Sequence, residues 1–467
     1  AHLSNGNGQS PSRYLPVGIM VPELVAWLDG AIRGGRVPSA DFVLYGRAQD
    51  FPYDTGGKGV FEVRADVVDA RLDYMPGWPA LEQVAGVLRF DRASMDISAR
   101  AGRIFGAQVQ EARVWMDDLV NGDLQIEGKV RGSGGDMLRF LKESPLGSSI
   151  RRELAMVSLS GVHDLSLRVT VPLYDDRAPK VKGAVSLRGG SLAVPRFGVG
   201  VDALQGVVQF TERGVSADGV RGRFRGRPLT VGAVTEGPPG KGRIKVSAPL
   251  HASLGELLET AEPPGVSGSA DWLIELLFPA FDNVDAGDAG VTAQVSSDLE
   301  GIAVNLPEPL AKPAGQRRPL RLRIGFDGEG MGPVAVSLGG SMRALLEFDD
   351  TGRQLTRASV QVGGGPAELK DFLGISITGQ LERLDLDAWR KVDFGSAAAA
   401  ADADAAPPLP LEWIDLEVGS LRALGLRFRD TRLQLRRGTA EWLVNLAGPD
   451  LAGRLTLPDA EHATLRV

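Results

Sequence analysis

The feature that most constrains the fold of this chain is an alternation of apolar and polar residues with a period of two. It is clearest in residues 61–67, 165–171 and 320–326, where every second residue is apolar. Successive side chains of a β-strand point to opposite faces, so each stretch predicts a strand with one apolar and one polar face. Such strands are typical of antiparallel sheets with one face in water. We therefore predict a mostly β fold.

Only a few short amphipathic helices are predicted. Residues 22–32 carry an apolar stripe at helical spacing, and the proline at the start suits a first helical turn. Asp136 can cap a second helix, which Pro145 would stop. Ser253 and Glu256 have the spacing of a capping box for a third helix. These helices are too few to cover the apolar faces of the predicted strands.

Composition argues against several classes of function. The net charge of −7 and pI of about 5.4 give no support to a nucleic-acid partner. The chain has no cysteine, which excludes disulfides, thiolate zinc sites and cysteine nucleophiles. One run of arginines at alternate positions is interpreted as the solvated face of a strand: Arg221, Arg223, Arg225 and Arg227.

No apolar run reaches the roughly 18 residues of a membrane span. The run at residues 272–280 is interrupted by Glu275 and Pro279, and its alternation predicts a strand. Because the chain begins with Ala1, we expect a fragment of a longer protein, with any membrane anchor outside it.

The chain contains an internal repeat. Residues 86–90 match residues 206–210, and residues 102–106 match residues 222–226, each pair 120 positions apart. One offset fits both matches without a gap, as expected of a structural module that recurs along the chain.

These patterns divide the chain into six expected segments. The expected segments are a disordered N-terminal segment (1–13), a first β-groove module with an entry helix (14–150), a second module (151–262), a third module (263–394), a disordered Ala/Asp/Pro-rich loop (395–410), and the start of a further, truncated β module (411–467).

Strands with an apolar face and no helical cover leave two solutions. The strands can divide into closed sandwiches, or one long antiparallel sheet can curl into a groove with an apolar lining. An open apolar lining would bind an equally apolar ligand. The candidate lining residues are the apolar ones flanked by polar neighbours: Phe61, Val63, Val67, Leu72, Leu88, Phe90, Ile97, Ile104, Leu165, Leu167, Leu187, Leu192, Val208, Phe210 and Phe224.

Several stretches resemble the YhdP group of AsmA-like proteins, and together they span most of residues 14–390. These stretches are residues 20–24, 27–29, 46, 51–53, 59–61, 74, 77–79, 297–301, 306–313 and 384–389. The resemblance implies a periplasmic body of repeating β-groove form, anchored in the inner membrane by regions outside this chain. It also implies a role in moving phospholipid between the inner and outer membranes, with phospholipid as the bound partner.

Two other functions stay open. One is a non-enzymatic scaffold that regulates outer-membrane assembly, with possible envelope protein partners, through its sheet edges. The other is a β-rich enzyme or binding module for glycans, although no acid–base pair or aromatic platform stands out.

Catalytic and metal-binding motifs are missing from the sequence. There is no phosphate-binding loop and no Gly-x-Ser-x-Gly elbow, so no enzyme activity and no cofactor are expected. The acidic positions Asp282, Asp285 and Asp288 lack the spacing of a calcium loop. The histidines are too scattered to predict a metal site: His2, His163, His251 and His462.

Overall fold

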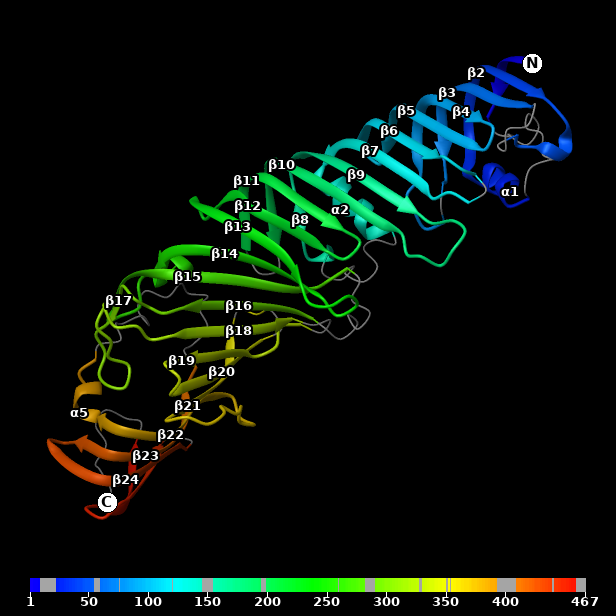
Figure 1. Ribbon diagram of the computed structural model, residues 1–467. Coiled ribbons are helices and arrows are strands. Elements are labelled where there is room, and N and C mark those ends of the chain that lie inside the picture. The colour runs from blue at the N-terminus through cyan, green and yellow to red at the C-terminus, as the bar shows by residue number, and fades with distance from the viewer. Residues whose placement is uncertain are drawn as a thin grey trace. The chain divides into compact units, whose positions relative to one another are not determined.

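The computed structural model describes residues 1–8, 22–53, 59–74, 76–119, 121–144, 154–194, 199–258, 260–281, 290–326, 330–349, 352, 354–392, 409–438 and 441–458. These residues form 26 strands of an open, mixed sheet, with four short α-helices (Figure 1). The prediction of a mostly β fold with few helices is confirmed. By contact density the chain divides into unit 1 (Ala1–Val246 with Phe278–Ala289) and unit 2 (Ser247–Leu277 with Gly290–Val467).

Unit 1 is built from long strands that follow one another in the sheet. Its elements are β1 (His2–Asn7), α1 (Pro22–Ala31), β2 (Ile32–Tyr45), β3 (Val60–Leu72), β4 (Leu81–Asp91), β5 (Ser94–Ile104), β6 (Ala107–Met116), β7 (Leu124–Ser133), α2 (Gly134–Glu143), β8 (Ser158–Leu159), β9 (Val162–Val171), β10 (Lys180–Val194), β11 (Val199–Thr211), β12 (Val215–Phe224) and β13 (Arg227–Glu236). Each strand from β1 to β7 pairs antiparallel with the next, and β7 pairs with β9. The same antiparallel order continues from β9 to β13.

The internal repeat appears as recurring elements. β6 and β13 begin and end 120 positions apart, at residues 107–116 and 227–236. α2 follows β7, and at the same offset α4 (Leu254–Leu258) follows β14 (Arg243–Ser253). The sequence repeat is therefore a repeat of strands and of the helix that ends them.

Strands of unit 1 carry irregularities near their middle. Register shifts interrupt the β3–β4 pair between Val67 and Ala70, and the β11–β12 pair between Asp202 and Gln205. Asp69 lies inside the first shift with a positive φ of 54°. An extra residue on one strand bends it and increases its twist, so repeated bulges curl a sheet.

Three local predictions need correction or comment. The disorder expected for residues 1–13 is wrong over His2–Asn7, because these residues form β1 and pair with β2. Asp136 is not the cap of α2: Ser133 is, and its hydroxyl accepts a hydrogen bond from the Asp136 backbone N–H. In the first case, a mostly polar segment forms a strand through backbone hydrogen bonds with β2. In the second case, the serine hydroxyl takes the capping position that was expected of the aspartate. Residues 395–408, expected to be a disordered loop, lie outside the described residues.

Other local predictions are confirmed. The helix expected at residues 22–32 is α1, although it ends at Ala31 and Ile32 begins β2. Ser253 and Glu256 exchange the two hydrogen bonds of a capping box at the start of α4. The apolar run at 272–278 lies in β15 (Val266–Pro279).

Unit 2 has shorter strands and two parallel pairings. β14 and β15 have residues in both units, and the remaining elements are β16 (Val291–Ser297), β17 (Ile302–Val304), β18 (Leu320–Phe326), β19 (Val334–Leu338), β20 (Met342–Phe348), β21 (Leu355–Val362), β22 (Gly374–Asp385), α5 (Leu386–Trp389), β23 (Leu411–Ala423), β24 (Leu426–Arg437), β25 (Glu441–Ala447) and β26 (Ala452–Pro458). β22 pairs parallel with both β21 and β23, which makes the predicted antiparallel sheet a mixed one. A buried cluster that includes Val362, Leu384 and Val418 joins these strands.

Candidate functional site

One continuous apolar face crosses unit 1, and the strand register defines it. Val63 lies opposite Phe90, and Phe90 lies opposite Met95. Leu167 lies opposite both Gly128 and Gly183. Directly opposed residues of an antiparallel pair point to the same face, so these registers carry one apolar face from β3 to β11.

The structure brings most of the predicted lining residues onto this face. The residues that the registers connect without an intervening shift are Phe61, Val63, Val67, Leu88, Phe90, Ile97, Leu165, Leu167, Leu187, Val208 and Phe210. The other four lie beyond the mid-strand shifts: Leu72, Ile104, Leu192 and Phe224. We call the first set, with the apolar residues opposite its members, the apolar face.

Burial differs along the apolar face. Phe61, Val63 and Phe90 are buried in a cluster with Tyr53, Met95 and Met116. Leu88 and Ile97 pack against that cluster and are half-buried. Four residues farther along the face are also half-buried: Leu165, Leu167, Val208 and Phe210. One end of the face is therefore a packed core, while its middle is only half covered.

The opposite face of the same strands is charged. Ion pairs join neighbouring strands there: Arg113–Asp96 (2.6 Å), Lys129–Glu111 (3.0 Å), Arg168–Glu127 and Arg188–Asp164 (2.5 Å). Most of these side chains are about half exposed, so each pair adds little stability. They define the water-exposed side of the sheet.

An open trough of about 930 Å³ lies on this polar face. Two rows of side chains border it across the strands: Arg113, Glu127, Arg168, Lys182 and Thr211 in one row, and Glu111, Lys129, Ser166, Ala184, Gln209 and Ser216 in the other. Leu167, Phe210, Val215 and Val234 also line the trough, but the two rows that border it are mostly charged or polar.

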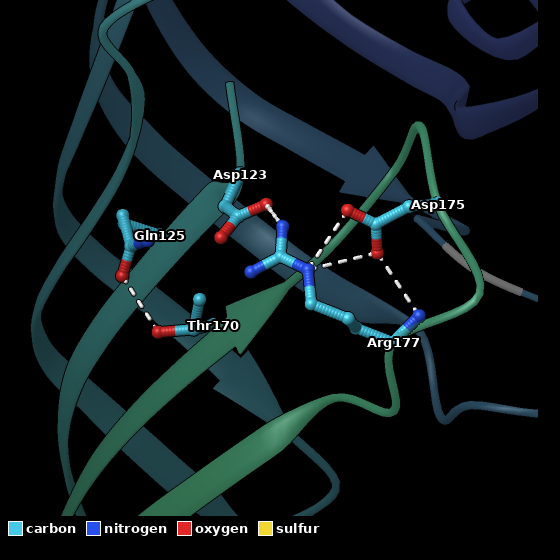
Figure 2. Close-up of polar contacts among 5 residues, drawn as sticks. All are labelled: Asp123, Gln125, Thr170, Asp175 and Arg177. Carbon is cyan, nitrogen blue, oxygen red and sulfur yellow. Dashed lines mark hydrogen bonds and ion pairs between the residues drawn. The ribbon is translucent and has the colours of Figure 1, made fainter. Parts of the chain in front are cut away.

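The loop after β9 is fixed beside the start of β7. The Arg177 guanidinium donates to Asp123 at 2.7 Å and to both carboxylate oxygens of Asp175 (Figure 2). Backbone and side-chain hydrogen bonds from Arg177 lower the pKa of Asp175. Thr170 donates to Gln125 at 2.8 Å across the same pair of strands. These contacts fix the relative position of β7 and β9, which both carry the apolar face.

A Ser–His–Asp chain of hydrogen bonds lies in unit 2, and sequence reasoning missed it. His251 Nδ1 lies 2.7 Å from Asp271 Oδ1, and His251 Nε2 lies 2.8 Å from Ser269 Oγ. In serine hydrolases the carboxylate of such a triad is buried. The Asp271 side chain is 90% exposed. That exposure argues against a catalytic role for these three residues.

No cluster of three or more metal-binding side chains occurs among the described residues. Within the same part of the chain, no helix has the length and apolar character needed to cross a bilayer.

A comparison with known protein families identifies the family of this chain. A family model described as YhdP protein matches residues 1–467. The chain belongs to the YhdP family. One relative is the intermembrane phospholipid transporter YhdP of Escherichia coli (strain K12), which is 27% identical over 475 residues.

That alignment covers 100% of this chain and 32% of the relative. The chain therefore spans about a third of the length of the curated YhdP protein it matches. No solved structure matches the chain. The family resemblance predicted from short sequence stretches is confirmed.

Sequence reasoning also missed part of the apolar face. Val114, Ile126, Val130, Val169 and Val185 lie on it by register. Each occupies an alternate position of its strand, so the period-two pattern could have found them once the strand ends were known.

Proposed function

We propose that this chain is a segment of a periplasmic phospholipid-transfer protein, anchored to the inner membrane through regions outside the chain. In this proposal, the apolar face shields acyl chains in transit between the inner and outer membranes. The E. coli relative, an intermembrane phospholipid transporter, supports phospholipid as the cargo. The chain acts by binding and shielding, with no enzymatic step.

The observation that carries the proposal is the contrast between the two faces of unit 1. From β3 to β11 one face is apolar and half covered, and the other carries cross-strand ion pairs. Exposing an acyl chain to water costs about 0.8 kcal/mol per CH₂. A continuous apolar track lowers that cost at every position, so lipid can slide along it.

The lining is assigned to the predicted residues on the apolar face. Leu165, Leu167 and Val208 are the strongest candidates, because they are half-buried and lie away from the packed cluster around Phe61. Phe61, Val63 and Phe90 support the face from within that cluster.

Site-specific photo-crosslinking in bacteria tests the proposal. A photoreactive residue at Leu167 is expected to capture phospholipid, and one at the adjacent Arg168 is not, because Arg168 lies on the charged face. Equal lipid capture at both positions, or none at either in a folded chain, would overturn the proposal. Capture of a protein in place of lipid at Leu167 would also contradict the proposal.

A further inference from the structure

The hairpin between β23 and β24 presents leucines to water at its tip. Leu424 is 81% exposed and Leu426 is 61% exposed. Single exposed leucines are common on protein surfaces, but two at one turn form a small apolar projection. These two leucines are the most exposed large hydrophobic residues of the hairpin.

The backbone of the tip is left-handed at both of its central residues. Leu424 has a φ of 54° and Gly425 a φ of 76°, which makes a two-residue hairpin turn with both central residues left-handed. Glycine or asparagine normally occupies the first of these positions, because a branched side chain is strained there. The β12–β13 turn has the same left-handed geometry at Arg225 and Gly226, and what distinguishes the β23–β24 turn is an exposed leucine at the first position.

The backbone of the tip is hydrogen-bonded to a carboxylate of α5. Asp387 of α5 accepts hydrogen bonds from the backbone N–H groups of Leu424 and Gly425, both at 2.8 Å. α5 is itself fixed, since Trp389 Nε1 donates to the Glu308 carbonyl at 2.9 Å. The leucine side chains therefore project from a rigid base.

The loop that carries Glu308 is also rigid. The Lys312 side chain is buried and donates to the carbonyls of Ile302 and Pro313, at 2.7 and 3.1 Å. Arg318 donates to three carbonyls of the same loop: Pro309, Leu310 and Ala311. Rigidity of this kind lowers the ordering cost when a tip docks on a surface.

Two arginines and two aspartates lie beside the tip. Arg422 and Arg427 lie directly opposite each other on β23 and β24, with Arg422 two positions before Leu424 and Arg427 one position after Leu426. Like charges directly opposite are unfavourable in a sheet. Arg422 is 3.7 Å from Asp385 and 3.9 Å from Asp387, while Arg427 has no ion pair with any residue that the structure describes. Asp385 and Asp387 offset the charge of Arg422, so Arg427 is the cation beside the exposed leucines that complements an anionic apolar interface.

We propose that the β23–β24 tip docks on the surface of an anionic phospholipid bilayer, with Leu424 and Leu426 inserted between headgroups and Arg427 at the phosphates. Apolar insertion combined with basic side chains is the general basis of reversible binding to anionic membranes. This docking is separate from the lipid track in unit 1 and does not depend on it.

Vesicle flotation of the 467-residue chain tests the proposal. The chain is expected to float with vesicles of phosphatidylcholine and phosphatidylglycerol, and to remain at the bottom with phosphatidylcholine alone or at high salt. Leu424→Asn suits the left-handed turn, so it preserves the fold while lowering binding about tenfold or more. Arg427→Glu is expected to abolish the preference for anionic vesicles.

The controls use matched positions of the same unit. Leu373→Asn removes another leucine that is 70% exposed, and Arg321→Glu reverses another exposed arginine; both are expected to float like the unmodified chain. Val208→Glu, which alters only the apolar face of unit 1, is also expected to float. This separates docking from lipid uptake, because a chain that merely extracts lipid stays at the bottom.

Three outcomes would overturn the proposal. These are no flotation with anionic vesicles, equal flotation with neutral ones, and unchanged flotation of Leu424→Asn. The first would leave a protein surface as the partner of the tip.

Discussion

Val208 of β11 lies directly opposite Val185 of β10 on the apolar face, whereas Val207 points to the other face and is 46% exposed. Two adjacent valines in one strand thus sample the two sides of the sheet. Comparing substitutions at these two positions distinguishes lipid binding by one face from a general need for apolar residues in the strand.

Val208→Glu is predicted to reduce bound phospholipid about tenfold or more, because it places a carboxylate beside the acyl chains. Val207→Glu is predicted to have little effect, since its side chain enters water. Lipid extraction from the purified variants measures the difference. Unfolding of Val208→Glu would instead indicate a closed packed core.

Leu88→Glu is predicted to block lipid passage in the same way, with Arg89→Glu as its control on the charged face. Leu88 packs against the cluster around Phe90, so this variant is also expected to lose about 1–3 kcal/mol of stability. Chemical unfolding and lipid extraction on the same samples check both effects. Retained lipid in a folded Leu88→Glu chain would contradict the assignment of this residue to the lining.

The alternation of residues predicted the strands well because it reports directly on which side chains face water. It could not place the irregular positions. β1 was missed since its residues other than Leu3 are polar or small, and it is held by backbone pairing with β2. Parallel pairing of β21, β22 and β23 has no local sequence signal, because it depends on how distant strands meet.

The candidate lining shows the same limit. Leu165 and Leu167 were identified because Ser166 and Arg168 flank them. Leu192 lies beyond a register shift and is 39% exposed, although its sequence pattern is as clear. After a bulge, the odd-numbered residues of a strand point to the face that the even-numbered ones occupied before it. The position of the bulge was not evident from residue types alone.

Gly190→Ala is predicted to destabilise unit 1 by about 2 kcal/mol or more. A Cβ at this position would lie 2.0 Å from the Ser160 carbonyl oxygen and 2.8 Å from the buried His163 ring. Gly128→Ala is the control, because its Cβ would meet no atom closer than 3.9 Å. Urea unfolding of the two variants checks the contrast. Equal stabilities would show that the backbone at Gly190 can shift freely.

Lys312→Met is predicted to destabilise unit 2 by about 1–3 kcal/mol at neutral pH, since two carbonyls lose their donor. Burial, reinforced by the charge of Arg318, lowers the pKa of Lys312 below its usual range. A lysine whose pKa falls on folding opposes folding while it is protonated, so its contribution to stability rises as pH increases toward 10.5. The stability gap between the two chains should therefore widen with pH. A gap that is constant from pH 7 to 10 would contradict this.

Asp387→Ala is predicted to speed amide exchange at Leu424 and Gly425 about tenfold, because both N–H groups lose their acceptor. Hydrogen bonds from Gly425 and Leu424, and the charges of Arg422 and Arg390, lower the pKa of Asp387 below 3.8. A carboxyl with a lowered pKa stabilises the fold above its unfolded value and loses that effect as pH falls through its folded value. The difference in thermal stability between this variant and the unmodified chain should thus begin to shrink as pH falls below about 4, and vanish only below the lowered pKa of Asp387. A difference that persists in acid would show that hydrogen bonding to the ionised carboxylate is not its cause.

The most direct test of the lipid track is native mass spectrometry of the chain purified from a bacterial envelope, with identification of any bound lipid. The account predicts one or more phospholipid molecules per chain, retained in Val207→Glu and lost in Val208→Glu. A folded chain that carries no lipid and takes up no added phospholipid would contradict it.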